Sequence, residues 1–130
     1  MTIRTTFPRP VREVDNLWIP LPDGARLAAR VWLPEDAAAD PAPALFEFLP
    51  YRKSDGTPIR DALRAPYYAG HGYAVLRVDM RGSGDSDGVL TDEYTTQEHD
   101  DAVACIAWIA AQPWCDGNVG MMGISWGGFN

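Results

Sequence analysis

Hydrophobic and polar positions along the chain change their period several times, and each change predicts a different element. Val11 to Pro20 and Ala25 to Leu33 look extended, and the turn sequence Pro22-Asp23-Gly24 between them is typical of an antiparallel hairpin. Pro34 to Pro43 is rich in Ala, Asp and Pro and has no period, so it predicts an exposed loop. The chain is therefore expected to open with a β-ribbon and a loop.

Short apolar runs and a helical pattern alternate in the middle of the chain. Ala44 to Leu49 is apolar and is closed by Pro50, which is the form of a buried strand. Ile59 to Ala69 predicts a helix that stops at Gly70, and Tyr73 to Val78 is the next apolar strand. The order strand, helix, strand is typical of a parallel pair.

The second predicted helix has the clearest signals. From Thr96 to Ala111 apolar residues recur at helical spacing, acidic residues stand near the amino end, and Thr95 or Thr96 can cap it. Val119 to Ile124 is a further apolar run, which we expect to be a buried strand that leads directly into Ser125. Alternating strands and helices predict an α/β fold with a parallel sheet covered on both faces.

Composition and charge narrow the classes of function. The 130 residues are 46% hydrophobic and 22% charged, which is the composition of one globular domain. A net charge of −7 without a Lys/Arg cluster argues against a nucleic-acid partner. The chain has neither a signal-peptide pattern nor the run of roughly 18 apolar residues that a membrane span needs, so we expect a soluble, cytoplasmic protein with no membrane partner.

Cysteine and histidine usage indicates neither a disulfide nor a metal site. Cys105 and Cys115 are ten positions apart, but two thiols without a secretory signal are expected to be reduced and buried. No Cys/His cluster has the spacing of zinc ligands. No metal is therefore expected.

One motif points directly to chemistry. Gly123-Ile124-Ser125-Trp126-Gly127 matches G-x-S-x-G, the nucleophile elbow, in which a serine on a strained strand-to-helix turn exposes its hydroxyl. A side chain at either glycine is expected to collide with the turn, because crowded or left-handed backbone is least costly at glycine. A Gly/Ser turn with no chemistry is the alternative that the motif alone leaves open.

An acyl-transfer site also needs hydrogen-bond donors for the negatively charged oxygen of its intermediate. The elbow itself supplies one, the backbone N–H of Trp126. The second is expected from the loop after an earlier strand, Pro50-Tyr51-Arg52-Lys53; that loop lacks a glycine run, so the Tyr51 hydroxyl is the candidate. By itself, a tyrosine after a strand is more often a packed aromatic with a solvated hydroxyl.

Three segments together resemble the X-Pro dipeptidyl-peptidase and cocaine-esterase family of hydrolases. They are Pro50-Tyr51-Arg52-Lys53, the stretch from Asp79 to Gly88, and the elbow with Gly128, and the resemblance covers nearly the whole chain. It implies an α/β-hydrolase fold in which Ser125 is the nucleophile, Tyr51 a side-chain oxyanion donor and Trp126 the residue that lends its N–H. The family often has tyrosine where this chain has Trp126, but only the backbone of that residue is used. Asp79 and Arg81 are expected to be scaffold that holds loop backbone.

A serine nucleophile needs a base, and the chain has only two histidines. His71 is expected at the end of the sheet opposite the elbow and His99 in the first turn of a helix, both on the surface. Because the acid and the histidine follow the serine in α/β-hydrolases, both are expected beyond Asn130. Residues 1–130 are thus expected to be the amino-terminal part of a catalytic domain in a longer protein, with a cap and a carboxyl-terminal β-sandwich implied by the resemblance.

The predicted function is a serine hydrolase that cleaves a small-molecule acyl ester or peptide-like amide through an acyl-enzyme, without a cofactor. The isolated chain is expected to be inactive, and its apolar edge strand is expected to make it poorly soluble or a homo-oligomer. Four alternatives remain: an X-Pro dipeptidyl-peptidase, an α-amino-acid ester hydrolase or acylase, a non-catalytic binding module, and a truncated product.

Overall fold

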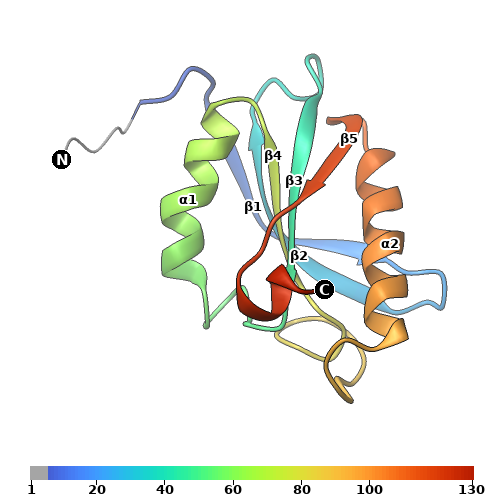
Figure 1. Cartoon of the computed structure of the whole chain (residues 1–130). Helices are drawn as coiled ribbons and strands as arrows, with labels where there is room; N and C mark the ends of the chain where they lie inside the picture. The colour runs from blue at the N-terminus through green and yellow to red at the C-terminus, as the bar shows by residue number, and fades with distance from the viewer. Residues whose placement is uncertain (1–5) are drawn as a thin grey trace.

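The computed structural model describes residues 6–130 as a five-stranded sheet between two helices (Figure 1). In chain order the elements are β1 (Val11–Pro20), β2 (Arg26–Pro34), β3 (Ala42–Leu49), α1 (Pro58–Gly70), β4 (Ala74–Asp79), α2 (Thr96–Ala110), β5 (Cys115–Met121) and the 3₁₀ turn η1 (Ser125–Gly128).

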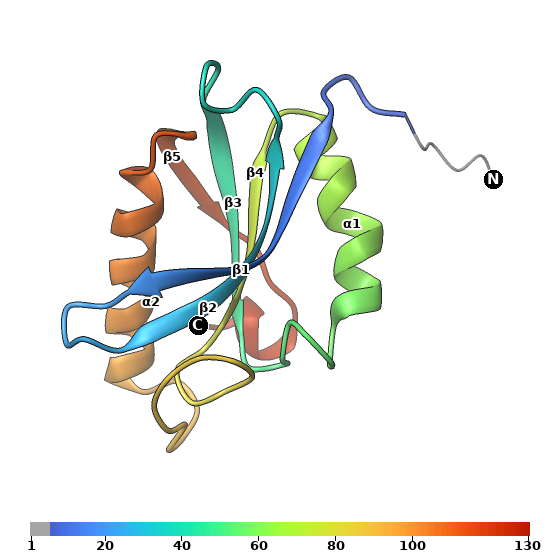
Figure 2. The ribbon, with the colours of Figure 1, turned by 180° about the vertical axis from the view of Figure 1, so that it is seen from behind.

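The strands lie side by side in the order β1-β2-β4-β3-β5. β1 pairs antiparallel with β2, and β2 pairs antiparallel with β4. β3 is parallel to both of its neighbours, β4 and β5. The hairpin therefore forms one edge of the sheet, seen from behind in Figure 2, and β5 forms the other edge. The carboxyl ends of β3, β4 and β5 point to the same side, where the loops that follow them meet.

The two faces of the sheet bury different kinds of side chain. Phe46 and Phe48 of β3 pack on the α2 face with Cys105 and Ile109, in the main apolar core. The α1 face has a smaller apolar cluster around Trp32, with Ala65, Ala69 and Val75. It also buries charge, because Glu47 of β3 pairs there with Arg60 and Arg64 of α1. This difference follows from the alternation of side chains along each strand.

Most predicted elements are confirmed within two residues. The hairpin, the strand that ends at Leu49, and the helices predicted over 59–69 and 96–111 all form, and Thr95 caps α2 by accepting the Glu98 N–H. Both cysteines are free and buried, as expected. Within residues 6–130, no helix is both long and apolar enough to cross a membrane.

The strand predicted over Val119 to Ile124 is wrong in position and in burial. β5 begins earlier, at Cys115, and ends at Met121, and most of its residues are exposed. The polar residues Asp116 to Asn118 fit this strand because β5 is an edge strand, with β3 on one side and no strand of the described chain on the other. The sheet is also mixed, since the hairpin adds antiparallel strands to the parallel ones.

Candidate active site

Ser125 lies at a sharp turn where the chain leaves β5 and enters η1. The backbone N–H of Met122 still donates to Phe46 O, at 3.0 Å, so the pairing with β3 continues beyond the end of β5. Ile124 is extended, and Ser125 then adopts a left-handed conformation with φ of 55°. A left-handed non-glycine residue between a strand and a helical turn is the strained geometry of a nucleophile elbow, and Ser125 is exposed there.

The two motif glycines are required by crowding. A Cβ on Gly123 would lie 1.7 Å from Gly127 O, and a Cβ on Gly127 would lie 2.6 Å from the side chain of Leu49. Contacts this short cannot be accommodated, because both neighbours belong to packed backbone or core. The expectation that side chains at these positions would collide with the turn is therefore confirmed.

Tyr51 lies beside the elbow, although 75 positions separate it from Trp126. The Trp126 N–H donates to the Tyr51 hydroxyl oxygen at 3.1 Å. The loop that carries Tyr51 is tight: Arg52 is left-handed with φ of 58°, and Gly56 N donates to Arg52 O. A Cβ on Gly56 would lie 1.9 Å from Tyr51 O, so only glycine allows this close approach. The fold thus brings together the hydroxyl and the N–H that the sequence suggested as oxyanion donors.

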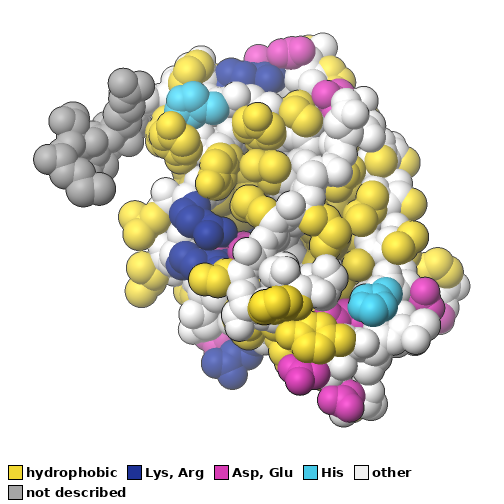
Figure 3. Space-filling model, viewed as in Figure 1, with side chains coloured by type: hydrophobic (Ala, Val, Ile, Leu, Met, Phe, Trp, Pro, Cys, Tyr) yellow, Lys and Arg dark blue, Asp and Glu magenta, His cyan; other side chains and the backbone are white. Residues whose placement is uncertain are grey.

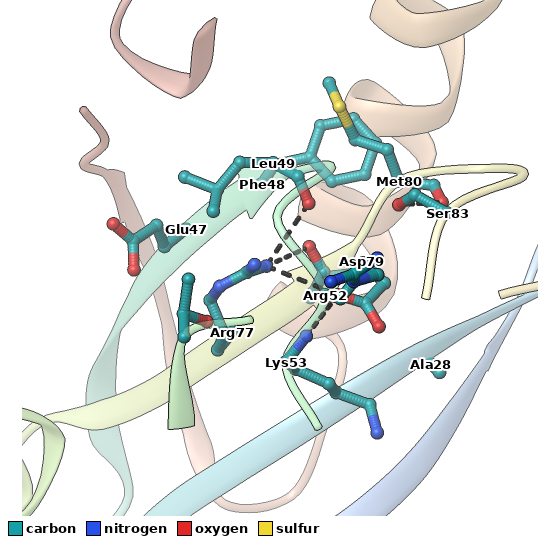
Figure 4. Close-up of polar contacts among 12 residues, drawn as sticks. Ala28, Glu47, Phe48, Leu49, Arg52, Lys53, Arg77, Asp79, Met80 and Ser83 are labelled. Atoms are coloured by element: carbon teal, nitrogen blue, oxygen red, sulfur yellow. Dashed lines mark hydrogen bonds and ion pairs between the residues drawn. The ribbon is translucent and has the colours of Figure 1, made fainter. Parts of the chain in front are cut away.

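Asp79, at the end of β4, ties the Tyr51 loop to the glycine-rich loop after β4. Figure 4 shows the backbone nitrogen of Lys53 and the guanidinium of Arg77 next to this carboxylate. One carboxylate oxygen accepts the Lys53 N–H at 2.8 Å, and the other accepts the Asp85 N–H at 3.2 Å. The Arg77 guanidinium lies 3.7 Å away and donates to Leu49 O, the last residue of β3. The scaffold role expected of Asp79 is therefore visible in its contacts.

The pKa values of the two carboxyl groups in this cluster, Asp79 and Asp85, shift in opposite directions. Burial raises the pKa of the Asp79 carboxyl, against the opposing effect of the two N–H donors and the Arg77 and Lys53 cations. The Lys53 ammonium is almost fully buried and donates to Asp85 at 2.9 Å. Hydrogen bonds from Ser54 and Lys53 hold the pKa of the Asp85 carboxyl below its ordinary value. The loop that carries Tyr51 is thus anchored by both backbone and side-chain contacts.

Arg81 is also scaffold, as expected. Its guanidinium forms a two-pronged pair with the buried carboxylate of Asp101 in α2, with both N–O distances at 2.8 Å. It also pairs with Asp23, in the turn of the hairpin, at 2.9 Å. Arg81 therefore joins the glycine-rich loop to α2 and to the hairpin, and it does not contact the elbow.

One residue beside the site, Glu98, was not predicted from the sequence. Glu98, in the first turn of α2 and 6% exposed, accepts a hydrogen bond from the indole N–H of Trp126 at 2.9 Å. The spacing Thr95-x-x-Glu98 is that of a capping box, which indicates where a helix begins. It does not indicate that Glu98 binds the Trp126 side chain. Beside the indole, an open hollow of about 270 Å³ is lined by Trp126 and residues 90–93.

Neither histidine forms a hydrogen bond with Ser125 in the part of the chain that the structure describes. His71 caps the carboxyl end of α1, at the amino-terminal side of β4, and its ring contacts Tyr67 O at 2.7 Å. His99 lies in the first turn of α2, and both side chains are exposed. Among the described residues, no three His, Cys, Asp or Glu side chains gather in a way that could hold a metal ion. Chemistry without a cofactor stays a prediction.

The strand order, the crossover helices and the elbow turn together define an α/β-hydrolase fold. The model of the family described as X-Pro dipeptidyl-peptidase (S15 family) matches residues 23–130. The chain belongs to this family of hydrolases.

Individual relatives agree with this assignment. The cocaine esterase of Rhodococcus sp. is 37% identical over 115 residues, which are 85% of this chain and 19% of that protein. A CocE/NonD family hydrolase from Staphylococcus aureus superimposes with a TM-score of 0.74 at 20% identity, over 97% of this chain and 28% of its own. An α-amino acid ester hydrolase superimposes with a TM-score of 0.68 at 25% identity, over 99% and 23%. The chain thus spans about a fifth of the length of the cocaine esterase that it matches.

Proposed function

We propose that Ser125 is the nucleophile of a serine hydrolase that cleaves an acyl ester or a peptide-like amide through an acyl-enzyme. One observation carries this proposal: Ser125 is left-handed and exposed at the elbow, directly before a backbone N–H that lies 3.1 Å from a tyrosine hydroxyl. A nucleophile and two convergent hydrogen-bond donors are parts that an acyl-transfer site requires.

In the proposed reaction, Ser125 Oγ attacks the carbonyl carbon of the substrate while its proton passes to a base. The carbonyl oxygen becomes negatively charged and accepts hydrogen bonds from the Trp126 N–H and the Tyr51 O–H. The Tyr51 hydroxyl accepts the Trp126 N–H in the free protein, so its own proton is available to a substrate oxygen between the two. The bond to the leaving group then breaks, the leaving group takes the proton, and water later releases the acid.

The acid and base of the triad are proposed to lie outside residues 1–130, in the same catalytic domain. This part of the proposal is supported by the exposed positions of His71 and His99 and by the order Ser, acid, His in α/β-hydrolases. The isolated chain is accordingly proposed to be inactive.

We also propose that the protein is cytoplasmic, as expected from the sequence.

An ester is the first candidate for the substrate, because the curated relative described above is an esterase. An X-Pro dipeptide amide is the second candidate, since the matching family model is that of an X-Pro dipeptidyl-peptidase. The two are distinguished by comparing kcat/KM of the full-length protein for a p-nitrophenyl ester and for an X-Pro anilide.

The test of the proposed function is turnover of p-nitrophenyl esters by the full-length protein and its variants. Ser125→Ala should abolish turnover, and Tyr51→Phe should lower kcat by about 10²-fold, because one oxyanion donor is lost. Tyr73→Phe is a matched control, since it removes a hydroxyl from an exposed tyrosine directly before β4. Turnover that survives in Ser125→Ala would indicate a different nucleophile, and an unchanged kcat in Tyr51→Phe would remove Tyr51 from the site.

A further inference from the structure

The Trp126 side chain is held from α2, and this contact bears on the oxyanion donor. We infer that Glu98 is a positioning residue, which fixes the backbone N–H of Trp126 by holding its indole. This inference rests on the proposed function, because it concerns the same N–H. It assigns a role in the reaction to α2, which also covers the sheet and pairs with Arg81 through Asp101.

Both oxygens of the Glu98 carboxylate are committed to the elbow and to the loop before α2. One accepts the indole N–H of Trp126 at 2.9 Å, and the other accepts the backbone N–H of Tyr94 at 2.9 Å. The side chain is 6% exposed, so water competes little for these bonds. Hydrogen bonds to a buried carboxylate are shorter and stronger than those between neutral groups.

Glu98 lies at the amino end of α2, in the first turn of the helix. Glu98 follows the Thr95 cap by three residues and donates its own N–H to the Thr95 hydroxyl at 3.2 Å. The backbone of Glu98 is thus fixed by the helix cap, and its side chain is held by the Tyr94 N–H. The carboxylate is therefore available as a fixed acceptor for the indole.

A second contact restrains the indole from the same loop. Tyr94 is left-handed, with φ of 56°, and its ring centroid lies 5.6 Å from that of Trp126 at an interplanar angle of 50°. Glu98 holds this strained residue through the Tyr94 N–H. The indole is thus restrained by a hydrogen bond to its edge and by a neighbouring ring, and both depend on Glu98.

Fixing the indole restrains the peptide group to which it is attached. The Trp126 N–H follows the left-handed Ser125 in a four-residue turn, and it is the donor aimed at Tyr51. An oxyanion donor is useful only where it meets the charge that forms in the transition state, and a displacement of about 1 Å is costly. The effect of losing Glu98 should therefore appear in kcat.

The experiment is a double-mutant cycle in the full-length protein, with turnover of a p-nitrophenyl ester as the readout. Glu98→Ala and Trp126→Phe should each lower kcat by about 10-fold, with KM within about twofold, because each removes the same hydrogen bond. The double variant should be no slower than either single variant. Glu98→Gln keeps one acceptor oxygen for the two N–H donors, so its kcat should lie between that of Glu98→Ala and that of the wild type.

Gln97→Ala is the matched control, because it removes a side-chain hydrogen bond from the same helical turn without contacting Trp126. It should leave kcat unchanged. Losses that multiply in the double variant, or a loss confined to KM, would overturn the role of Glu98. If Glu98→Ala does not fold, the cycle is run with Glu98→Gln, which weakens the bond to the indole. The effects of Glu98→Gln and Trp126→Phe on kcat should then still be coupled. Additive effects would reject the role of Glu98.

Ser125→Ala on the same substrate separates the two claims. If it abolishes turnover while the cycle is additive, only the role of Glu98 fails. If turnover survives in Ser125→Ala, the proposed function itself fails.

Discussion

At the scale of single residues, the elbow depends on a strained serine that its surroundings hold in place. A left-handed serine costs on the order of 1–3 kcal/mol. Two hydrogen bonds secure the backbone after Ser125. The Phe129 N–H donates to Trp126 O at 3.0 Å, and the side-chain amide of Asn130 donates to Phe48 O at 3.0 Å. The strain is therefore balanced by contacts within the turn and to the end of β3.

Replacement of Gly123 tests the crowding at this turn. Gly123→Ala should lower the thermal unfolding midpoint and abolish turnover, because its Cβ would lie 1.7 Å from Gly127 O. Gly128→Ala is the control, since its Cβ would meet nothing closer than 3.7 Å and its φ is not positive. Its unfolding midpoint should stay close to that of the wild type. Equal midpoints for all three proteins would show that the crowded geometry is wrong.

Cys105 gives a prediction about pH. Burial raises the pKa of its thiol from 9.0 to about 12. Between these two values the unfolded chain loses the thiol proton while the folded chain keeps it, so the free energy of unfolding should fall as the pH rises through this range. Chemical denaturation at several pH values should show this slope in the wild type and a shallower slope in Cys105→Ala. Identical slopes would contradict a protonated, buried thiol.

At the scale of elements, the carboxyl ends of β3 and β4 are joined by one buried carboxylate. Asp79 accepts backbone N–H groups from both following loops and lies next to the buried Arg77. Removing one partner of a buried charged pair leaves the other without compensation. The Tyr51 loop and the core of the sheet therefore depend on the same residue.

Asp79→Ala should lower the free energy of unfolding by about 3–5 kcal/mol, measured by urea denaturation, because it removes a carboxylate that pairs with the buried Arg77 and leaves two backbone N–H groups without their acceptor. Asp55→Ala is the control from the same loop: it removes an exposed ion pair with Arg52, which should be worth less than about 1 kcal/mol. Similar losses in the two variants would mean that the buried cluster contributes little.

The sequence predicted the elements that have a local signal and missed those that depend on contacts. The Pro22-Asp23-Gly24 turn and the capped start of α2 are encoded within a few residues, and both form. β5 was misplaced because it pairs with β3 at Cys115 and again from Val119, and the polar residues 116–118 lie at an irregularity between them that no apolar pattern reveals. In the site, the elbow was readable from its glycines and Tyr51 from the family resemblance. Glu98 was not, because its partner lies 28 positions away.

At the scale of the whole molecule, large apolar side chains gather on the face that carries β5 (Figure 3). Several large apolar residues on α1, on α2 and around β5 are exposed: Ile59, Leu63, Tyr67, Val103, Met121 and Ile124. The edge of β5 also has backbone groups without a neighbouring strand in the described chain. An apolar surface next to a free strand edge favours association.

Residues 1–130 produced alone should therefore self-associate, and sedimentation velocity should show species larger than 14.3 kDa. Leu63→Lys, at a position 77% exposed on α1, should increase the monomer fraction, because it places a charge in the apolar surface. Arg12→Lys on β1, at the opposite edge of the sheet, should leave the distribution unchanged. A wild-type chain that is monomeric and melts cooperatively would contradict this expectation.

The most direct test of the central claim is whether Ser125 becomes covalently modified as an activated nucleophile. The full-length protein is treated with a fluorophosphonate, digested, and analysed by mass spectrometry beside Ser125→Ala. The account predicts one adduct, on the peptide that contains Ser125, and none in the variant. An unmodified wild-type protein, or an adduct on another residue, would contradict the assignment of Ser125 as the nucleophile.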